Sequence, residues 1–276
     1  MTNEKAMKAR PNRVLASKIG KAKDTIGSVD RQILSAWFDD TLSPQHFKDY
    51  CPNGLQIQGA SRVKLLACAV TASINAIEAA REQGAQALLV HHGYFWRGED
   101  PCVVGIKHRR IQLLLKHNIS LFAYHLPLDV HPTLGNNAQL GARLGWAVDE
   151  RFGEQNLICA TQLKAPIQAA QLAQILKRQL KQAPLLVGDL NRSVQRIAWC
   201  TGGAQDSLQD AINAGCDAFV SGEISERTTH LARETGVIYA AAGHHATERF
   251  GVQALARAAS EALGVAWCFV DDPNPV

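Results

Sequence analysis

Residues 84–93 read GAQALLVHHG, a stretch that contains a helix stop, a short apolar run and a pair of histidines. Gly84 is the residue type expected just beyond the end of a helix, and the apolar run at 87–90 has the length of a buried strand. The same order recurs at 215–223, GCDAFVSGE, where Gly215 takes the place of Gly84. The two stretches indicate that one α/β unit occurs twice in the chain.

Strands and helices alternate around both stretches. In the first half, apolar runs at 63–70 and 119–124 flank the run at 87–90, and the patterns at 73–83 and 109–117 predict helices between them. The second half repeats this order, with strands and helices predicted at 194–200, 206–213, 226–234, 237–242 and 252–263. Any two βαβ segments look loosely alike, but here the polar residues align as well as the apolar runs. We therefore predict an α/β fold of two duplicated, intertwined lobes with mostly parallel sheets and flanking helices.

Charge and composition divide the chain into four parts. We expect a basic arm at 1–28, a first α/β lobe at 29–150, an intervening α/β segment at 151–190 and a second lobe at 191–276. Seven lysines and arginines against two acidic residues give residues 1–24 a charge of +5, so the remainder carries 4 − 5 = −1. The arm has no apolar periodicity, so it is predicted to be an extension without fixed structure; organelle targeting or nucleic-acid contact is the alternative. In the intervening segment, apolar spacing predicts a helix at 167–180.

The overall composition is that of a soluble globular protein. Hydrophobic residues make up 46% of the 276 residues and charged residues 20%. No apolar run approaches the roughly 20 residues that span a bilayer, and no apolar signal segment opens the chain. The seven cysteines include no CxxC pair, which favours a reducing, cytoplasmic location over a disulfide framework. The near-neutral globular part offers no obvious basic face for nucleic acid.

Two histidine–carboxylate pairs follow predicted strands. His125 and Asp129 lie in YHLPLD, and His244 and Glu248 lie in GHHATE. The segment after Gly243 is expected to open a helix, and residues four apart share one face of a helix, so His244 and Glu248 can bind one centre. Ligands of parallel α/β sheets bind beyond the carboxyl ends of the strands. We therefore expect these pairs to converge with the two histidines that end the stretch at 84–93.

The residue types favour a site for two metal ions. Consecutive residues of an extended segment point to opposite sides, so His91 and His92 serve two ions more easily than one. A carboxylate can bridge two ions, whereas an imidazole nitrogen cannot. The predicted arrangement has His91 and His244 on one ion, His92 and Asp129 on the other, and Glu248 between them. Mixed nitrogen and oxygen ligands suit Zn, Mn, Fe, Co or Ni better than Ca or Mg.

Less specific sequence signals lie near these candidate ligands in the chain. Tyr94, Trp96 and Arg97 follow the histidine pair directly, so they could stack on a base and hold a phosphate, or pack in an oligomer interface. The turn at 201–203, Thr-Gly-Gly, could bind an anion through its amides or simply be a tight turn. His131 could line the pocket, but its neighbour is a proline, which favours a role in a turn.

The motifs together resemble a known family. They are YCPNGLQIQG (50–59), VHHGYFWRGE (90–99), YHLPLDVHPTLGNN (124–137), WCTGGAQ (199–205), FVSGEISE (219–226) and AAGHHATERFG (241–251). From about Asp30 to Val276 the chain resembles the Nif-three-like dinuclear metal-centre hexameric proteins, which include the GTP cyclohydrolase 1 type 2 homologues. It is most like the compact YbgI-type members. The basic arm lies outside the resemblance.

The resemblance implies a toroidal homohexamer with two divalent ions facing its interior. By the resemblance, the ligands are His91, His92, Asp129, His244 and Glu248, and His125 lies beside them. The leading hypothesis is a metal-dependent hydrolase that acts on a nucleotide, with metal-activated hydroxide attacking C8 of the guanine ring of GTP. In it, Glu248 bridges the ions and His125 moves protons. The alternatives are a non-catalytic metal-handling or regulatory scaffold protein and a two-metal phosphoesterase.

Overall fold

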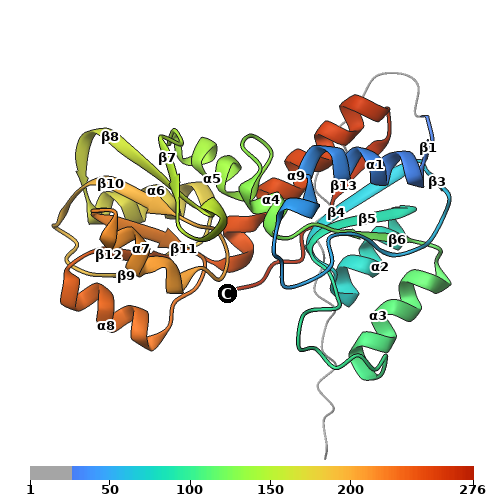
Figure 1. Ribbon diagram of the computed structural model, residues 1–276, viewed down its shortest axis with the longest axis horizontal. Coiled ribbons are helices and arrows are strands. Elements are labelled where there is room, and N and C mark those ends of the chain that lie inside the picture. Colours follow the sequence, from blue (N-terminus) through green and yellow to red (C-terminus); the bar gives the residue numbers. More distant parts are fainter. Residues whose placement is uncertain (1–26) are drawn as a thin grey trace, which may run out of the picture.

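A computed structural model of the chain describes residues 27–276, and the basic arm predicted at 1–28 lies almost wholly outside the described residues. Two α/β lobes stand side by side, with one long helix running between them (Figure 1). Among the described residues, no helix is both long and apolar enough to cross a membrane.

The first lobe is built on a five-stranded sheet of order β13-β4-β5-β6-β2. The strands are β2 (Gly54–Ile57), β4 (Leu65–Thr71), β5 (Ala87–His92), β6 (Ser120–Ala123) and β13 (Ala266–Phe269). All neighbours are parallel except β2, which pairs antiparallel with β6. Helices α1 (Arg31–Leu42) and α9 (His244–Leu263) bury apolar side chains on one face, and α2 (Ile74–Glu82) and α3 (Gly105–Lys116) on the other. A small ribbon of β1 (Val29–Asp30) and β3 (Arg62–Val63) lies beside this sheet.

The second lobe contains a six-stranded sheet of order β7-β8-β10-β11-β12-β9. Its strands are β7 (Glu150–Phe152), β8 (Ile158–Gln168), β9 (Leu185–Val187), β10 (Ser193–Trp199), β11 (Ala218–Ser221) and β12 (Ile238–Ala241). Helices α5 (Asn136–Leu144) and α6 (Ala169–Leu180) pack on one face, and α7 (Leu208–Asn213) and α8 (Glu226–Thr235) on the other. The remaining elements are α4 (Leu126–Val130) and 3-10 turns at Pro44–His46, Glu154–Asn156 and Gln205–Ser207.

The α/β fold predicted from the sequence is confirmed. The order β4-α2-β5-α3-β6 in the first lobe recurs as β10-α7-β11-α8-β12 in the second, and in each case the three strands are parallel neighbours. The sheets as a whole are mixed, because antiparallel strands are added at their edges: β2 in the first lobe, and β7, β8 and β9 in the second.

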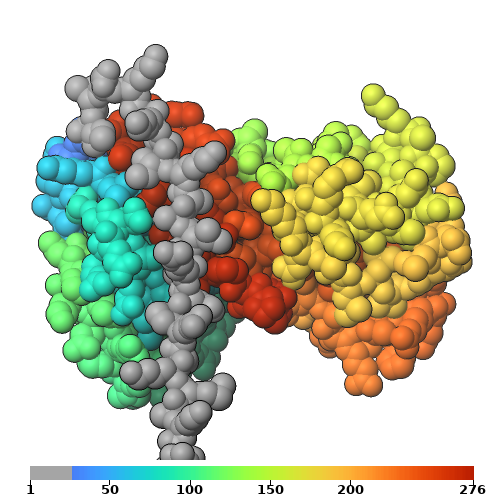
Figure 2. All heavy atoms as spheres, turned by 180° about the vertical axis from the view of Figure 1, so that it is seen from behind, coloured from blue at the N-terminus to red at the C-terminus, as the bar shows by residue number. Residues whose placement is uncertain are grey.

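The two lobes are intertwined through the end of the chain. Helix α9 begins directly after β12 of the second sheet, and β13 then pairs with β4 of the first sheet. Seen from behind, the C-terminal region (red) lies between the blue and cyan atoms of the first lobe and the yellow and orange atoms of the second (Figure 2). The predicted residue limits therefore do not coincide with the sheets. Residues 151–190 supply strands of the second sheet, and residues 244–269 return to the first lobe.

Side-chain caps set several helix ends. Ser73 accepts a hydrogen bond from the backbone N–H of Ala76 and begins α2, as its position in the sequence predicts. The helix predicted at 167–180 begins later, at Ala169, because Gln168 still belongs to β8 and forms a capping box with Gln171.

Candidate metal centre

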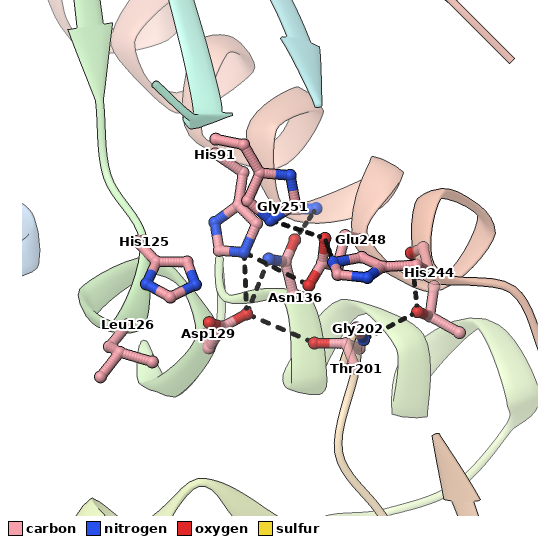
Figure 3. A network of polar contacts seen from close by, with 12 residues as sticks. His91, His125, Leu126, Asp129, Asn136, Thr201, Gly202, His244, Glu248 and Gly251 are labelled. Atoms are coloured by element: carbon pink, nitrogen blue, oxygen red, sulfur yellow. Dashed lines mark hydrogen bonds and ion pairs between the residues drawn. The ribbon is translucent and has the colours of Figure 1, made fainter. Parts of the chain in front are cut away.

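The polar cluster predicted from the strand ends exists at the junction of the two lobes. His91 and His92 end β5, His125 follows β6, and His244 opens α9 directly after β12. The two carboxylates come from helices, Asp129 from α4 and Glu248 from α9. Figure 3 shows the side chains of His91, Asp129, His244 and Glu248 pointing toward one another.

Glu248 joins two groups of side chains whose nitrogen and oxygen atoms lie within 4.8 Å of one another. His91 and Asp129 form one group with Glu248, and His92 and His244 form the other. The Oε1 atom of Glu248 lies 3.4 Å from Nε2 of His91. Its Oε2 atom lies 3.3 Å from Nε2 of His92 and 3.0 Å from Nε2 of His244. One carboxylate oxygen therefore faces each group.

The predicted pairing of these residues is wrong in one respect. The sequence assigned His91 to the group of His244 and His92 to that of Asp129, whereas the structure exchanges the two histidines. Alternation along an extended strand predicts that the two rings point apart, but their centres lie 4.6 Å from each other at the end of β5, and alternation does not say which ring faces α4. The ring that faces α4 is that of His91, because its Nδ1 atom bonds to the carbonyl of Tyr124 at the end of β6, from which α4 follows.

Hydrogen bonds orient the imidazole rings. The Nδ1 atom of His91 lies 2.9 Å from the carbonyl oxygen of Tyr124, and Nδ1 of His244 lies 2.6 Å from a carboxylate oxygen of Glu223. Both partners can only accept, so each Nδ1 carries a proton. In the neutral ring this leaves the lone pair of Nε2 facing the cluster, which is the arrangement common to histidines that bind metals.

His125 is held in the same way. Its Nδ1 atom donates to Oδ1 of Asp49 at 2.7 Å, and the same carboxylate accepts hydrogen bonds from Asn53 and from the backbone N–H of Leu126. Burial alone would raise the pKa of Asp49, but the hydrogen bonds and the neighbouring imidazole lower it to about 2. Asp49 is therefore a carboxylate that fixes the tautomer of His125.

Three side chains of the cluster are buried, whereas His92 and His244 are half-buried at the cavity side. The exposed fraction is 0% for His91, 6% for Asp129 and 3% for Glu248. Two of the facing atoms, Nε2 of His91 and Oε2 of Glu248, are buried without a hydrogen-bond partner. Such atoms are rare in folded proteins. Their converging lone pairs fit a cation, and the donor set of imidazoles and carboxylates suits a transition metal.

The pKa shifts within the cluster also favour a bound cation. Burial acts against the charged form of His91, but Asp129 and Glu248 prevail and raise its pKa to about 10. For His244, Glu248 and Glu223 overcome the opposing effect of burial and raise the pKa to about 9. Burial holds the pKa of His92 at about 3, so this ring is neutral at physiological pH. The carboxylates thus attract positive charge strongly, and a divalent ion would supply it.

Two asparagines support the cluster in a way that the sequence did not reveal. Asn136 donates to Oδ1 of Asp129 at 2.8 Å and accepts from the backbone N–H of Gly251, so it links α4, α5 and α9. Asn137 accepts from the backbone N–H of Thr201 at 2.9 Å. Both residues lie in the first turn of α5, and both are fully buried. The available signal was a pair of amide residues shortly after Asp129.

The turn at 201–203 acts as a tight turn rather than as an anion site. The backbone N–H of Gly202 donates to the hydroxyl of Thr247, and its carbonyl accepts from Gly222. Gly202 has a φ of +69°, and a Cβ atom there would lie within 1.9 Å of Oε1 of Glu248. The glycine is needed because the backbone passes directly against the carboxylate.

Replacement of Gly202 by alanine is expected to weaken metal binding. The added methyl group must displace the carboxylate of Glu248, so the metal bound per chain should fall well below the wild-type value. Gly264→Ala is the matched control, because Gly264 has a similar φ of +68° but open space around it. Elemental analysis of both purified variants measures the effect. Equal metal content in the two variants would contradict this role of Gly202.

The three residues predicted to contact a substrate are placed differently. A cavity of about 580 Å³ opens beside the cluster, and Trp96 lines it together with His125 and Tyr50. Arg97 is exposed, donates to the backbone carbonyl of Asp49 and lies over the ring of Tyr50, outside this lining. Tyr94 is only 4% exposed, and its hydroxyl donates to the carbonyl of Ala72. The expectation for Tyr94 is thereby corrected, because its side chain belongs to the core.

His131 has the turn role that its proline neighbour favoured. Its Nδ1 atom accepts hydrogen bonds from the backbone N–H groups of Thr133 and Leu134. It stands outside the cluster and outside the cavity lining.

The sequence pattern of the Duf34/NIF3 (NGG1p interacting factor 3) family matches residues 29–275. The chain belongs to this family. Among curated relatives, a GTP cyclohydrolase 1 type 2 homolog of Neisseria meningitidis serogroup A is 50% identical over 245 residues, which are 89% of this chain and 98% of the relative. The GTP cyclohydrolase 1 type 2 homolog of Pseudomonas aeruginosa is 49% identical, over 86% of this chain and 95% of the relative.

Solved structures of similar chains share the fold. One described as "protein ybgI, unknown function" is 43% identical, has a TM-score of 0.87 and is matched over 90% of this chain and 100% of its own. A second solved structure, TTHA1606 from Thermus thermophilus, is 33% identical with a TM-score of 0.82, again over 90% and 100%. The Duf34/NIF3 fold therefore extends over nearly all of the described residues.

Proposed function

We propose that the cluster holds two divalent metal ions and that the protein is a metal-dependent hydrolase. The observation that carries this proposal is the position of Glu248, which presents one oxygen to each of two ligand groups. His91 and Asp129 would complete one ion's protein ligands, and His92 and His244 those of the other. Three protein ligands for each ion leave coordination positions open to water or substrate, as in catalytic sites. The ligand types suit Zn, Fe, Mn, Co or Ni.

Paired ions of this kind lower the pKa of bound water and supply hydroxide at neutral pH. His125 is the residue suited to move the proton. One of its ring nitrogens lies within 4.8 Å of ring nitrogens of His91 and His92, and Asp49 holds the other. The free Nε2 can therefore accept a proton on the cavity side and release it to a leaving group.

The substrate that we propose is nucleotide-like, in keeping with the name of the GTP cyclohydrolase 1 type 2 homologs that the chain resembles. For GTP, one water would add at C8 and open the imidazole ring of guanine to a formamide, and a second water would cleave the formamide to an amine and formate. Trp96 offers a surface on which a flat base can stack, and its ring centre lies 5.0 Å from that of His125. The described residues that line the cavity include Glu154 and Asp206 but no lysine or arginine. A bound nucleotide would thus place its base in the cavity beside the metal ligands and its phosphates toward the solvent.

A metal and substrate screen tests the proposal. The purified protein is expected to carry about two transition-metal ions per chain, and reconstitution with each metal should yield turnover of a nucleotide or related heterocycle. Turnover of phosphate esters alone would favour the phosphoesterase reaction. Tight binding of two ions without turnover of any nucleotide would favour a metal-handling protein instead and would reject the hydrolase.

Asp49→Asn is expected to lower turnover about 100-fold or more while leaving the metal content unchanged, because an amide in place of the carboxylate favours the wrong tautomer of His125. The measurement is kcat beside elemental analysis, with ¹⁵N NMR of the histidine rings reporting the tautomer. Asp40→Asn, an exposed change of equal charge, is the control. If Asp49→Asn kept full turnover, His125 would not be the proton carrier.

We also propose that the chain assembles as a homohexamer. Large apolar side chains are exposed on and before α3: Val104 is 64% exposed, and Ile106 and Leu115 are 58% exposed. An apolar surface of this kind is commonly covered in an assembly. Light scattering should give a mass near six times the 30.0 kDa of one chain. A mass of one or two chains at micromolar concentration would reject the hexamer.

A further inference from the structure

A second cavity, of about 400 Å³, has a lining separate from that of the cavity at the metal cluster. It is formed where α5, α6 and α9 meet (Figure 1), and it shares no lining residue with the cavity of Trp96. Its charged lining residues are all cations: Arg143 from α5, Lys181 from the end of α6, and Arg249 and Arg257 from α9. No carboxylate is among the described residues that line it. We call it the basic groove.

Two of the arginines are held in place by aromatic rings instead of acids. Arg143 lies over the ring of Phe250 at 4.6 Å, and its Nε atom donates to the backbone carbonyl of Gln179. Arg257 lies over the ring of Trp267 at 5.8 Å. Neither forms an ion pair with a carboxylate of the described residues. Stacking fixes the plane of a guanidinium group and leaves its N–H edges available for an anion.

Arg249 and Lys181 add to the excess of positive charge in the basic groove. Arg249 pairs with Asp271 at 2.5 Å, but its Nε atom is buried without a hydrogen-bond partner. Lys181 ends α6 in the left-handed conformation, with a φ of +59°, where a glycine would be the usual residue. Four cations gathered around one depression with a single acidic partner raise the local potential. The chain beyond residue 24 has a net charge of only −1, so this concentration is local.

We propose that the basic groove binds a small anion that carries two phosphate groups or more. The planar fork of an arginine matches phosphate oxygens, and a volume of about 400 Å³ exceeds the need of a single phosphate ion. Gln139 and Gln253 also line the groove and supply amide groups for the rest of the molecule. The ligand would touch α5 and α9, which carry Asn136 and Glu248, so it would lie against both helices that organise the metal cluster.

Calorimetric titration with fructose 1,6-bisphosphate, a bisphosphate that chelates metals weakly, tests the site in the full-length protein as purified. The double variant Arg143→Gln/Arg257→Gln is expected to bind about tenfold more weakly or worse, since each lost contact is a charged hydrogen bond. Its metal content and melting temperature should remain those of the wild type. Fructose 6-phosphate should bind the wild type more weakly than the bisphosphate does.

The matched control is Arg109→Gln/Arg233→Gln, which removes the same charge from two exposed arginines of α3 and α8. This variant should bind the bisphosphate within about twofold of the wild type, because contacts and not net charge hold the ligand. If both double variants lost the same affinity for the bisphosphate, the loss would come from overall charge, and the proposal would be overturned. An absence of binding at millimolar bisphosphate would also overturn it, as would binding that Glu248→Gln abolishes and the groove variant leaves intact.

Discussion

Glu248→Gln is expected to lower the affinity for both metal ions by at least about 100-fold, since loss of even an outer contact of a metal ligand costs 10- to 100-fold. Glutamine keeps the shape of the side chain but replaces a charged oxygen with an amide nitrogen that cannot bind a metal. The carboxylate belongs to both ligand groups, so both ions should be affected. Changing a residue of one group alone, such as His244, should weaken one ion more than the other.

Elemental analysis after dialysis and competitive titration with a chelator measure this effect. Glu261→Gln is the matched control, because Glu261 is an exposed glutamate of the same helix. Any nucleotide turnover should disappear together with the metals. A Glu248→Gln protein that retained two ions per chain would rule out the bridging position on which the proposed function depends.

Removal of the metals is expected to lower the melting temperature of the wild-type protein by about 10 °C. A ligand present at about 1,000 times its Kd stabilises the folded state by about 4 kcal/mol, and 1 kcal/mol corresponds to about 2–4 °C for a chain of this size. The cluster joins β5 and α4 of the first lobe to the start of α9 beside the second. Without the ions, unpaired atoms such as Nε2 of His91 remain buried.

Differential scanning calorimetry before and after treatment with a chelator gives the shift, and added metal should restore it. The chelator should change the melting temperature of Glu248→Gln by much less, because that variant holds little metal at the outset. A wild-type protein that melted at the same temperature with and without chelator would show that the cluster does not bind metal tightly.

Local features of the fold follow from the sequence because short-range interactions determine them. Ser73 and Gly84 mark the ends of α2 through a side-chain cap and a left-handed residue, and both can be read without knowledge of the rest of the chain. The path of α9 was harder to predict, because β13 finds its partner β4 some 200 positions away in the chain, and long-range pairing leaves no local trace.

The surroundings of the cluster needed the structure for the same reason. Asp49 lies far from His125 in sequence and carried no predicted role, yet its carboxylate contacts the ring directly. Tyr94 shows the opposite case: it is next to the histidine pair in sequence, but the turn after β5 directs its hydroxyl toward the core. Closeness in the chain is thus a poor guide to closeness in the site.

The sequence by itself determined the repeated α/β unit and the residue types that end its strands. Periodicity and the carboxyl ends of parallel strands are properties of the backbone, so His91, His92, His125 and His244 could be expected at one edge. Only the tertiary structure decided which histidine shares which carboxylate, and that Asn136 ties Asp129 to α9. These depend on how two lobes pack across one helix, and packing is set by contacts between residues that no local pattern connects.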